Sequence, residues 1–262
     1  MAVILKKSRE LDLMRKANQI VVMVWEAMHD MAAPGVTTQQ LNQVADEIIR
    51  KNGAVPSFLG YPHRGVNDFP AAICASINQE IVHGIPSQDR VLRSGDIISI
   101  DVGTIFKGYQ GDGAITLPVG EVGEEAKKLI QVTRTALRAG IAQAWKGNRT
   151  GDISRAIEEY VLSQGMQVVR EYTGHGIGRA MHEDPQVPNY YDSRMPTVLL
   201  KPGMTLALEP MVNLGTWKTC VLSDGWTVET QDGQLSAHFE HTIAITDGEP
   251  EILTQLNGAD FI

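Results

Sequence analysis

Two stretches of the sequence are each followed by a similar stretch at almost the same spacing, and this internal repeat limits the possible folds. The first pair is GVTTQQLNQVADEIIRKNG (residues 35–53) and GNRTGDISRAIEEYVLSQG (147–165), which align without a gap. The second pair is LRSGDIISID (92–101) and LKPGMTLALE (200–209). The offsets of 112 and 108 residues are too long for a solenoid, so they indicate two halves of one domain.

Each half has the same predicted order of elements. Both members of the first pair carry apolar residues near helical spacing, between a threonine that could cap the helix start and a glycine that could end it. Longer helical patterns open the halves at 9–31 and 124–145, and both members of the second pair read as a turn and then a strand ending in an acid. Further strands are predicted at 71–77, 109–119, 226–230, 238–246 and 251–253.

These elements predict an α+β fold in which helices cover one antiparallel or mixed sheet shared by both halves. We expect a single catalytic domain over residues 1–262, with a first half at about 8–120 and a second at about 121–253. Chance similarity of two amphipathic helices remains an alternative for the first pair taken alone. The two pairs together favour the repeat.

Composition excludes several classes of protein. A net charge of −8 and a pI near 5.4 argue against sequence-independent binding of nucleic acid, which needs clustered basic residues. Cys74 and Cys220 form no metal-binding pair and no disulfide framework, which fits a reducing compartment. The apolar run at 20–25 is far too short to cross a bilayer, and the charged start MAVILKK does not resemble a signal peptide. We therefore expect a cytoplasmic protein.

Four acids stand singly within strand-like apolar runs. Asp101 and Asp112 lie on either side of a predicted turn at 107–108, and counting inward from that turn places them at neighbouring positions of a hairpin. Glu209 lies in TLALEPMV and Glu240 in SAHFEHTIAI. A single acid in a strand is usually solvated on the outer face, and this alternative stays open for each of them. If a pseudo-two-fold axis relates the halves, however, Asp101 and Glu209 converge near it.

The segment YTGHGIGRAMHEDP (172–185) adds two histidines seven residues apart among glycines. Four clustered carboxylates without a cation would repel one another by several kcal/mol in a low-dielectric pocket. Two divalent ions remove that repulsion, and carboxylates with one imidazole suit Mn²⁺, Fe²⁺, Co²⁺ or Zn²⁺, with ions about 3.5–4 Å apart. The residues therefore favour a two-metal hydrolase.

At this point the chain closely resembles the type I methionine aminopeptidases. The resemblance spans about residues 11–253 and rests on GDIISIDVGTIFKGYQGD, YTGHGIGRAMHEDPQVPNY, LKPGMTLALEPMV and SAHFEHTIAIT. It implies the pita-bread creatinase/aminopeptidase fold, in which pseudo-two-fold related halves share a curved antiparallel sheet. It also implies removal of the initiator methionine from nascent chains whose second residue is small.

The resemblance implies a role for each candidate residue. Five would bind two metal ions: Asp112 and Glu240 shared by both, Asp101 on one, and His175 with Glu209 on the other. It further implies that Glu209 is also the general base, that His182 hydrogen-bonds the substrate carbonyl, and that His83 lies near the scissile nitrogen. An apolar pocket for the methionine side chain (S1) would be lined by Tyr61, Phe69, Cys74, Met181 and Trp226.

Several residues depart from the family pattern or receive no direct role. The segment YPHRGVNDFPAAIC (61–74) is longer than in the commonest bacterial form, and Gly113 stands where a hydroxyl residue is frequent. We expect Gly113 to change the hydrogen bonding near Asp112 without abolishing catalysis. His241 should point to the opposite face of its strand from Glu240. His29, His63 and His238 are interpreted as structural, and Glu183 and Asp184 as supporting or surface residues.

Two other functions remain as alternatives. Prolidases and Xaa-Pro aminopeptidases share the fold and the five ligands, but they usually carry an extra N-terminal domain, and here the catalytic pattern begins near residue 1. A pseudo-enzyme that binds ribosomes or nucleic acid would have lost metal ligands, whereas all five are present. We expect a monomer that contacts nascent peptides with N-terminal methionine, and transiently the ribosome, but no specific nucleic acid and no membrane.

Overall fold

The computed structural model describes residues 3–63 and 65–255, so Arg64, within the long 61–74 segment, lies outside the described residues. Four helices form: α1 Ser8–Met31, α2 Thr38–Lys51, α3 Glu124–Ile141 and α4 Thr150–Ser163. The strands of the first half are β1 Val55–Pro56, β2 Ile73–Ile77, β3 Glu80–Val82, β4 Ile97–Phe106 and β5 Tyr109–Pro118. Those of the second half are β6 Gln167–Val168, β7 Thr173–Gly176, β8 Glu183–Pro188, β9 Thr205–Leu208, β10 Met211–Asn213, β11 Thr219–Val221, β12 Val228–Thr230, β13 Ser236–His238, β14 Glu240–Ala244 and β15 Glu251–Ile252.

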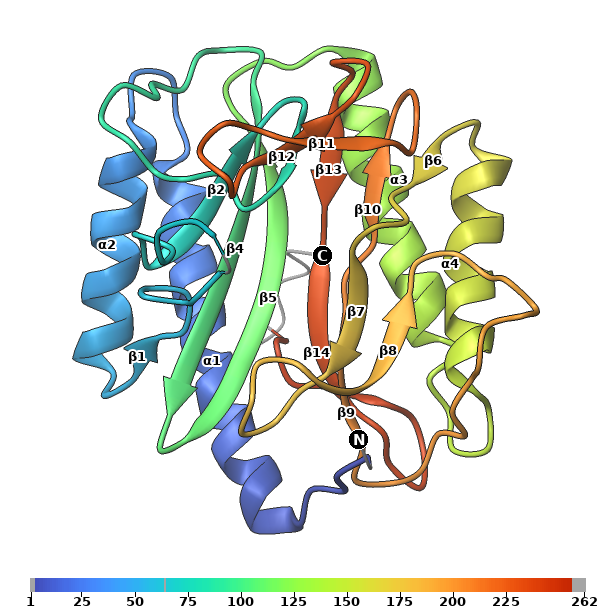
Figure 1. The fold of residues 1–262 in the computed structure, drawn as a ribbon. Helices are drawn as coiled ribbons and strands as arrows, with labels where there is room; N and C mark the ends of the chain where they lie inside the picture. Colours follow the sequence, from blue (N-terminus) through green and yellow to red (C-terminus); the bar gives the residue numbers. More distant parts are fainter. Residues whose placement is uncertain (1–2, 64, 256–262) are drawn as a thin grey trace.

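Strands from both halves join in one main sheet. Its path runs β1-β4-β5-β14-β9-β7-β8, with β2 paired to β4 and β15 paired to β14. Within the described residues every pairing in this sheet is antiparallel. The seam between the halves is β14, which pairs with β5 on one side and β9 on the other (Figure 1). Two three-stranded sheets, β13-β10-β6 and β11-β12-β3, complete the β structure.

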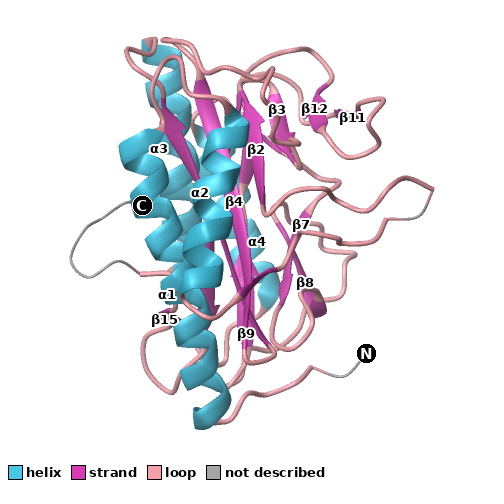
Figure 2. Ribbon diagram, turned by 90° about the vertical axis from the view of Figure 1, so that its left-hand side faces the viewer, coloured by secondary structure: helices cyan, strands magenta, loops and turns pink. Residues whose placement is uncertain are grey.

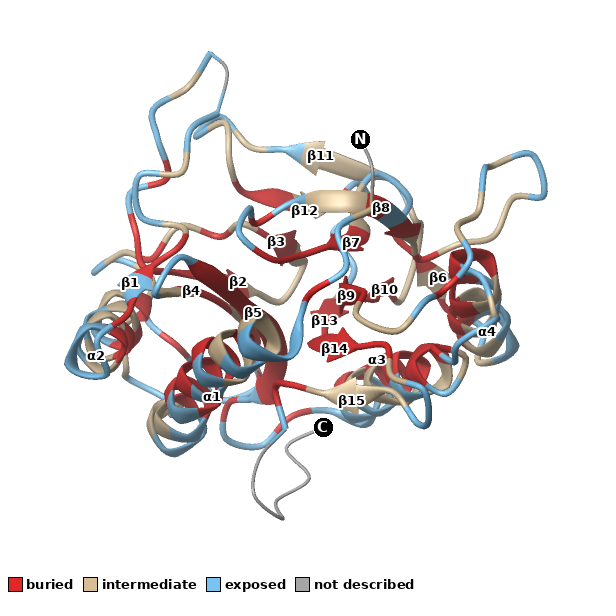
Figure 3. Cartoon of the chain, turned by 90° about the horizontal axis from the view of Figure 1, so that it is seen from below, coloured by how far each residue is buried: buried red, intermediate tan, exposed pale blue. Residues whose placement is uncertain are grey.

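The helices lie together on one side of the main sheet (Figure 2). Each buries an apolar stripe against the strands, as in α1, where Ile20, Val24 and Trp25 are at most 4% exposed. Burial is concentrated where the helices meet the sheet and along its central strands (Figure 3). No helix in the described part of the chain is both long and apolar enough to cross a lipid bilayer.

The internal repeat appears in the structure as matching local contacts. Thr37, before α2, forms an isolated β-bridge with Val91, and Arg149, before α4, forms one with Leu199. These two bridges are offset by the same 112 and 108 residues as the sequence pairs. The predicted α+β fold with two related halves is confirmed.

Some predicted boundaries were wrong. The strand expected to end at Asp101 continues to Phe106, because β4 and β5 pair along their entire length as a ten-residue hairpin. The strand expected over 238–246 is interrupted at Phe239, whose N–H donates to Pro210 O at 3.3 Å, so β13 and β14 belong to different sheets. Thr150 does not cap α4; the N-cap is Arg149, whose N–H donates to the Asp152 carboxylate at 2.8 Å.

Candidate metal centre and substrate pocket

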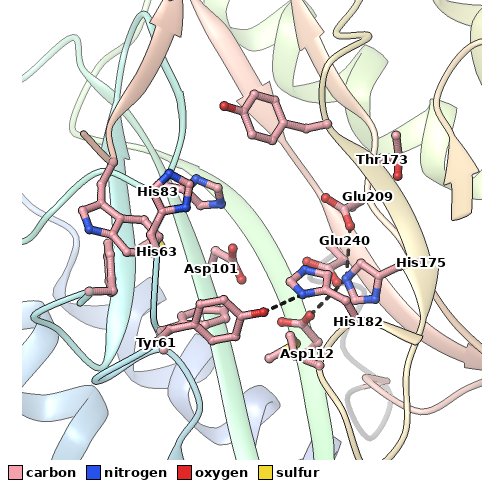
Figure 4. Close-up of a pocket in the computed structure, with 16 residues that line it drawn as sticks. Tyr61, His63, His83, Asp101, Asp112, Thr173, His175, His182, Glu209 and Glu240 are labelled. Carbon is pink, nitrogen blue, oxygen red and sulfur yellow. Dashed lines mark hydrogen bonds and ion pairs between the residues drawn. The ribbon is translucent and has the colours of Figure 1, made fainter. Parts of the chain in front are cut away.

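A pocket of about 270 Å³ opens on the face of the main sheet away from the helices. The residues predicted to bind metal and substrate all line it: Tyr61, Phe69, Cys74, His83, Asp101, Asp112, His175, Met181, His182, Glu209, Trp226 and Glu240. Figure 4 shows the acids and His175 on one side of the pocket and the aromatic wall with His83 on the other. The sequence motifs therefore converge on one place in the fold.

The hairpin β4–β5 presents the first two acids on the same face. Gly103 is the register partner of Asp112, and Ala114 is the partner of Asp101, so the two carboxylates are diagonal neighbours across the pair. Glu240, at the start of β14, lies opposite Ala114 on the next strand. Glu209 directly follows β9.

His175 comes from β7 and faces these carboxylates. Its Nε2 lies 3.4 Å from Glu209 Oε1 and 3.8 Å from Asp112 Oδ2. Its Nδ1 is 2.9 Å from Gly176 O, the arrangement in which Nδ1–H donates to the carbonyl and leaves the Nε2 lone pair free. Ligand atoms of Asp112, His175 and Glu240 lie within 4.8 Å of one another, which fits a divalent cation.

The hydrogen bonding of the acids also fits a cation. Asp101 Oδ1, Asp112 Oδ1 and Glu240 Oε1 are buried, and the described residues offer them no hydrogen-bond partner. Buried carboxylate oxygens left unpaired are costly unless a metal ion accepts them. The donor set of four acids and one imidazole is the one expected for a metal site.

Burial and mutual repulsion shift the pKa values of these acids upward. Burial raises the pKa of Asp101 to about 7. Burial, and next the charge of Asp101, raise the pKa of Asp112 well above its usual range. Burial together with repulsion from neighbouring carboxylates likewise raises the pKa of Glu209 and of Glu240. Each acid is therefore a poor anion unless a positive charge is supplied.

The histidines of the pocket are shifted in the opposite direction. Burial, and then the neighbouring His182, lower the pKa of His175 to about 3. Burial lowers the pKa of His83 to about 4, with further contributions from His182 and His63. All of these imidazoles are therefore neutral at physiological pH, the form that can bind a metal or exchange hydrogen bonds with a substrate.

His182 lies on the turn between β7 and β8, beside His175. The ring centroids are 4.4 Å apart. Its Nδ1 forms a 2.8 Å hydrogen bond with the Tyr61 hydroxyl (Figure 4). Tyr61 thus ties the long 61–74 segment to the histidine.

The apolar wall is built around Trp226. Phe69 meets its ring edge-on at 5.1 Å between centroids, and Trp226 Nε1 donates to Asn67 O at 2.8 Å. Met181 and Cys74 are buried nearby, 6% and 4% exposed. Tyr61 and Phe69 both reach the pocket although their segment is longer than usual.

The sequence interpretation missed four pocket residues: Phe58, His63, Tyr172 and Thr173. His63, interpreted as structural, lies 5.0 Å from Trp226 between ring centroids and lines the pocket. No motif marked these four, because they reach the pocket only through the folding of the 58–69 loop and the approach to β7. His238 and His241 are buried outside the pocket, and His241 Nδ1 bonds Thr254 Oγ1 at 2.7 Å.

Gly113 is explained by packing behind the candidate metal centre. A Cβ atom added to it would lie 2.6 Å from Trp25 Cζ2, so the indole of α1 occupies the space of a side chain. The backbone of Asp112 is held instead by Asn18 Oδ1, which accepts its N–H at 3.2 Å, and by Thr242 Oγ1, which donates to its carbonyl at 2.8 Å. Hydrogen bonds from α1 and β14 thus support this acid.

Comparison with known proteins decides the family. Residues 12–247 match the model of metallopeptidase family M24. The chain belongs to this family. It is 52% identical over 253 residues to the "Methionine aminopeptidase" of Clostridium acetobutylicum, covering 96% of this chain and 98% of the relative.

Solved structures of the M24 type agree. A methionine aminopeptidase from Thermotoga maritima superposes with a TM-score of 0.93 at 43% identity, covering 97% of this chain and all of that one. An Xaa-Pro dipeptidase from Bacillus anthracis matches with a TM-score of 0.76 at 23% identity, and this chain covers 63% of it. At that identity the dipeptidase shares the fold alone.

Proposed function

We propose that this protein is a methionyl aminopeptidase, a metallo-exopeptidase that removes the N-terminal methionine from nascent proteins and peptides whose second residue is small. One observation carries the proposal: five candidate ligands from both halves meet beside an apolar, aromatic pocket in a chain of metallopeptidase family M24. The dipeptidase alternative has only a shared fold in its favour.

Two divalent ions, from among Co²⁺, Mn²⁺, Fe²⁺ and Zn²⁺, would be held by this donor set. In this proposal Asp112 and Glu240 are shared between the ions, Asp101 serves one, and His175 with Glu209 serves the other. Such ions, when bound, polarise the scissile carbonyl and make hydroxide available near neutral pH. The unpaired oxygens of Asp101, Asp112 and Glu240 support this assignment.

The protein's own side chains would perform the remaining steps. Glu209, whose side chain is 14% exposed, accepts a proton from the attacking water. His182 donates a hydrogen bond from Nε2 to the substrate carbonyl oxygen, as Nδ1 accepts one from Tyr61. His83 lies near the scissile nitrogen.

The methionine side chain would occupy the wall formed by Tyr61, Phe69, Cys74, Met181 and Trp226. Soft sulfur and aromatic contacts suit an unbranched thioether. These residues come from the long 58–74 region and from the turns before β8 and β12, so a folded molecule is needed to assemble them.

The setting of the enzyme belongs to the same proposal. Residues 1–262 would act as one catalytic domain in the cytoplasm, as a monomer that touches the ribosome briefly while its substrates emerge. The formal charge of −8 favours peptide substrates over nucleic acid.

The test is to strip the protein of metal, add back Mn²⁺, Fe²⁺, Co²⁺ or Zn²⁺ one at a time, and offer three peptides. We expect cleavage of Met-Ala-Ser and much slower cleavage of Leu-Ala-Ser. Preferential hydrolysis of Ala-Pro-Ala would assign the chain to the prolidase branch instead, and no hydrolysis with any metal would favour a binding protein of this fold.

A further inference from the structure

A buried ion pair outside the pocket joins the N-terminal segment to the turn that carries His182. Lys6 Nζ lies 2.5 Å from Glu183 Oε2, and the two side chains are only 4% and 8% exposed. Glu183 directly follows His182 in the chain. Two charges withdrawn from water this far hold each other firmly, because removing either one strands the other.

The two oxygens of the Glu183 carboxylate have separate partners. Oε1 accepts backbone N–H bonds from Arg179 at 2.8 Å and from Ala180 at 3.3 Å, while Oε2 accepts from Lys6. The carboxylate therefore closes the turn between β7 and β8 from the inside. Met181 and His182 project from that turn into the pocket.

Lys6 is itself fixed by surrounding backbone. Its N–H donates to Gly203 O at 2.7 Å, just before β9, and its Nζ also donates to Ile4 O at 3.2 Å. A Cβ atom added to Gly178 would lie 2.4 Å from Lys6 Cε, so the lysine stem runs directly against the turn. The ammonium group is thus held at one place beneath residues 178–183.

His182 itself is solvent-exposed and has little packing to hold its ring. Its side chain touches the 61–74 segment through Tyr61 and the metal side through His175. The direction of its Nε2 therefore depends on the backbone of the turn. A displacement of about 1 Å at such a group can lower a rate by about 100-fold.

We propose that Lys6 and Glu183 are positioning residues for His182: the buried ion pair fixes the β7–β8 turn so that the imidazole points at the substrate carbonyl. The inference rests on the proposed function, because it assigns His182 its work there. It makes the N-terminal segment part of the catalytic apparatus although no residue of that segment lines the pocket.

The test is a double-mutant cycle with Met-Ala-Ser as substrate. Lys6→Met should lower kcat about 10- to 100-fold with little change in KM, since only alignment toward the reacting carbonyl is lost. In a His182→Ala background, Lys6→Met should cause no further loss. Equal losses in both backgrounds, or no loss in the first, would overturn the proposal in favour of a merely structural pair.

A matched control is Lys146→Met, which removes an exposed ion pair with Asp247 (2.6 Å) and should leave kcat unchanged. If Lys6→Met does not fold, the uncharged pair Lys6→Met/Glu183→Gln replaces it in the same cycle. The swapped pair Lys6→Glu/Glu183→Lys should not restore kcat, because a lysine at 183 cannot accept the N–H groups of Arg179 and Ala180.

A measurement independent of activity separates this inference from the proposed function. In ¹⁵N-histidine NMR spectra, the imidazole resonances of His182 should shift in Lys6→Met and stay in place in Lys146→Met. Unchanged His182 resonances in Lys6→Met would refute the positioning role even if the wild-type protein cleaves methionine peptides. A wild-type protein that cleaves none would instead refute the proposed function, with the spectra still deciding on the turn.

Discussion

Removing metal from this protein should make its stability fall as the pH rises through neutrality, because the acids at the candidate metal centre must then ionise unpaired. Burial raises the pKa of Asp101 from 3.8 to about 7. A carboxyl group with a raised folded-state pKa contributes full stability below its unfolded pKa and loses that contribution as the pH passes its folded pKa. Asp112, Glu209 and Glu240 are shifted in the same direction.

The magnitude for Asp101 follows from its shift of about three pKa units. At about 1.36 kcal/mol per unit, ionisation of Asp101 removes about 4 kcal/mol in total, of which about 2.5 kcal/mol is lost between pH 5 and pH 8. For a chain of 262 residues, that part corresponds to a decrease in Tm of about 5 °C. The other three acids add to it.

The assay is thermal or urea unfolding of the metal-stripped protein at pH 5, 6, 7 and 8, for the wild type and for Asp101→Asn. The variant is the needed reference, because the buried histidines act with the opposite sign: burial lowers the pKa of His175 and of His238 to about 3, so their contributions are lost as the pH falls. We expect the stability of wild type relative to the variant to fall by at least about 2.5 kcal/mol from pH 5 to pH 8. Parallel curves for the two proteins would refute the reasoning, as would a difference that excess Mn²⁺ does not reduce.

Three further predictions concern the pocket and its support. Glu209→Gln should lower kcat by about 100- to 10,000-fold with an unchanged circular dichroism spectrum, and a fully active variant would exclude Glu209 as the base. Metal affinity, measured by titration calorimetry, should weaken as the pH falls below about 7, since metal must displace a proton from Asp101; equal affinity at pH 6 and pH 8 would contradict this. Gly111→Ala should destabilise the protein by about 1–3 kcal/mol in urea unfolding, because the new Cβ would lie 2.6 Å from the backbone of Ala17, whereas Gly123→Ala, with open space around it, should change stability little.

The repeat and the hairpin geometry could be predicted because they depend on local signals. Spacing from the turn at 107–108 was enough to place Asp101 and Asp112 on one face, and the structure shows them as diagonal neighbours. The offsets of 112 and 108 residues reappear in the bridges Thr37–Val91 and Arg149–Leu199. Patterns of this kind persist in the fold because each depends on residues close in the chain or on the same strand pair.

Features created by distant packing could not be predicted. The interruption at Phe239 has no Gly or Pro signal, since it arises where its N–H bonds Pro210 O rather than a strand. The pairing of Lys6 with Glu183 joins residues 177 positions apart. Gly113 drew attention as a departure from a family pattern, but only the position of Trp25 explains it.

The central place of β14 determines when a newly made molecule can begin to work. β14 closes the main sheet between β5 and β9 and brings Glu240, yet almost the whole chain precedes it. Domains tend to form from the N-terminus during synthesis, so the first half would wait at the ribosome with β5 as an uncovered edge. Until that final strand docks, neither half can protect its hydrogen-bonding edge, and the molecule remains an inactive, aggregation-prone precursor that favours rapid completion or chaperone cover.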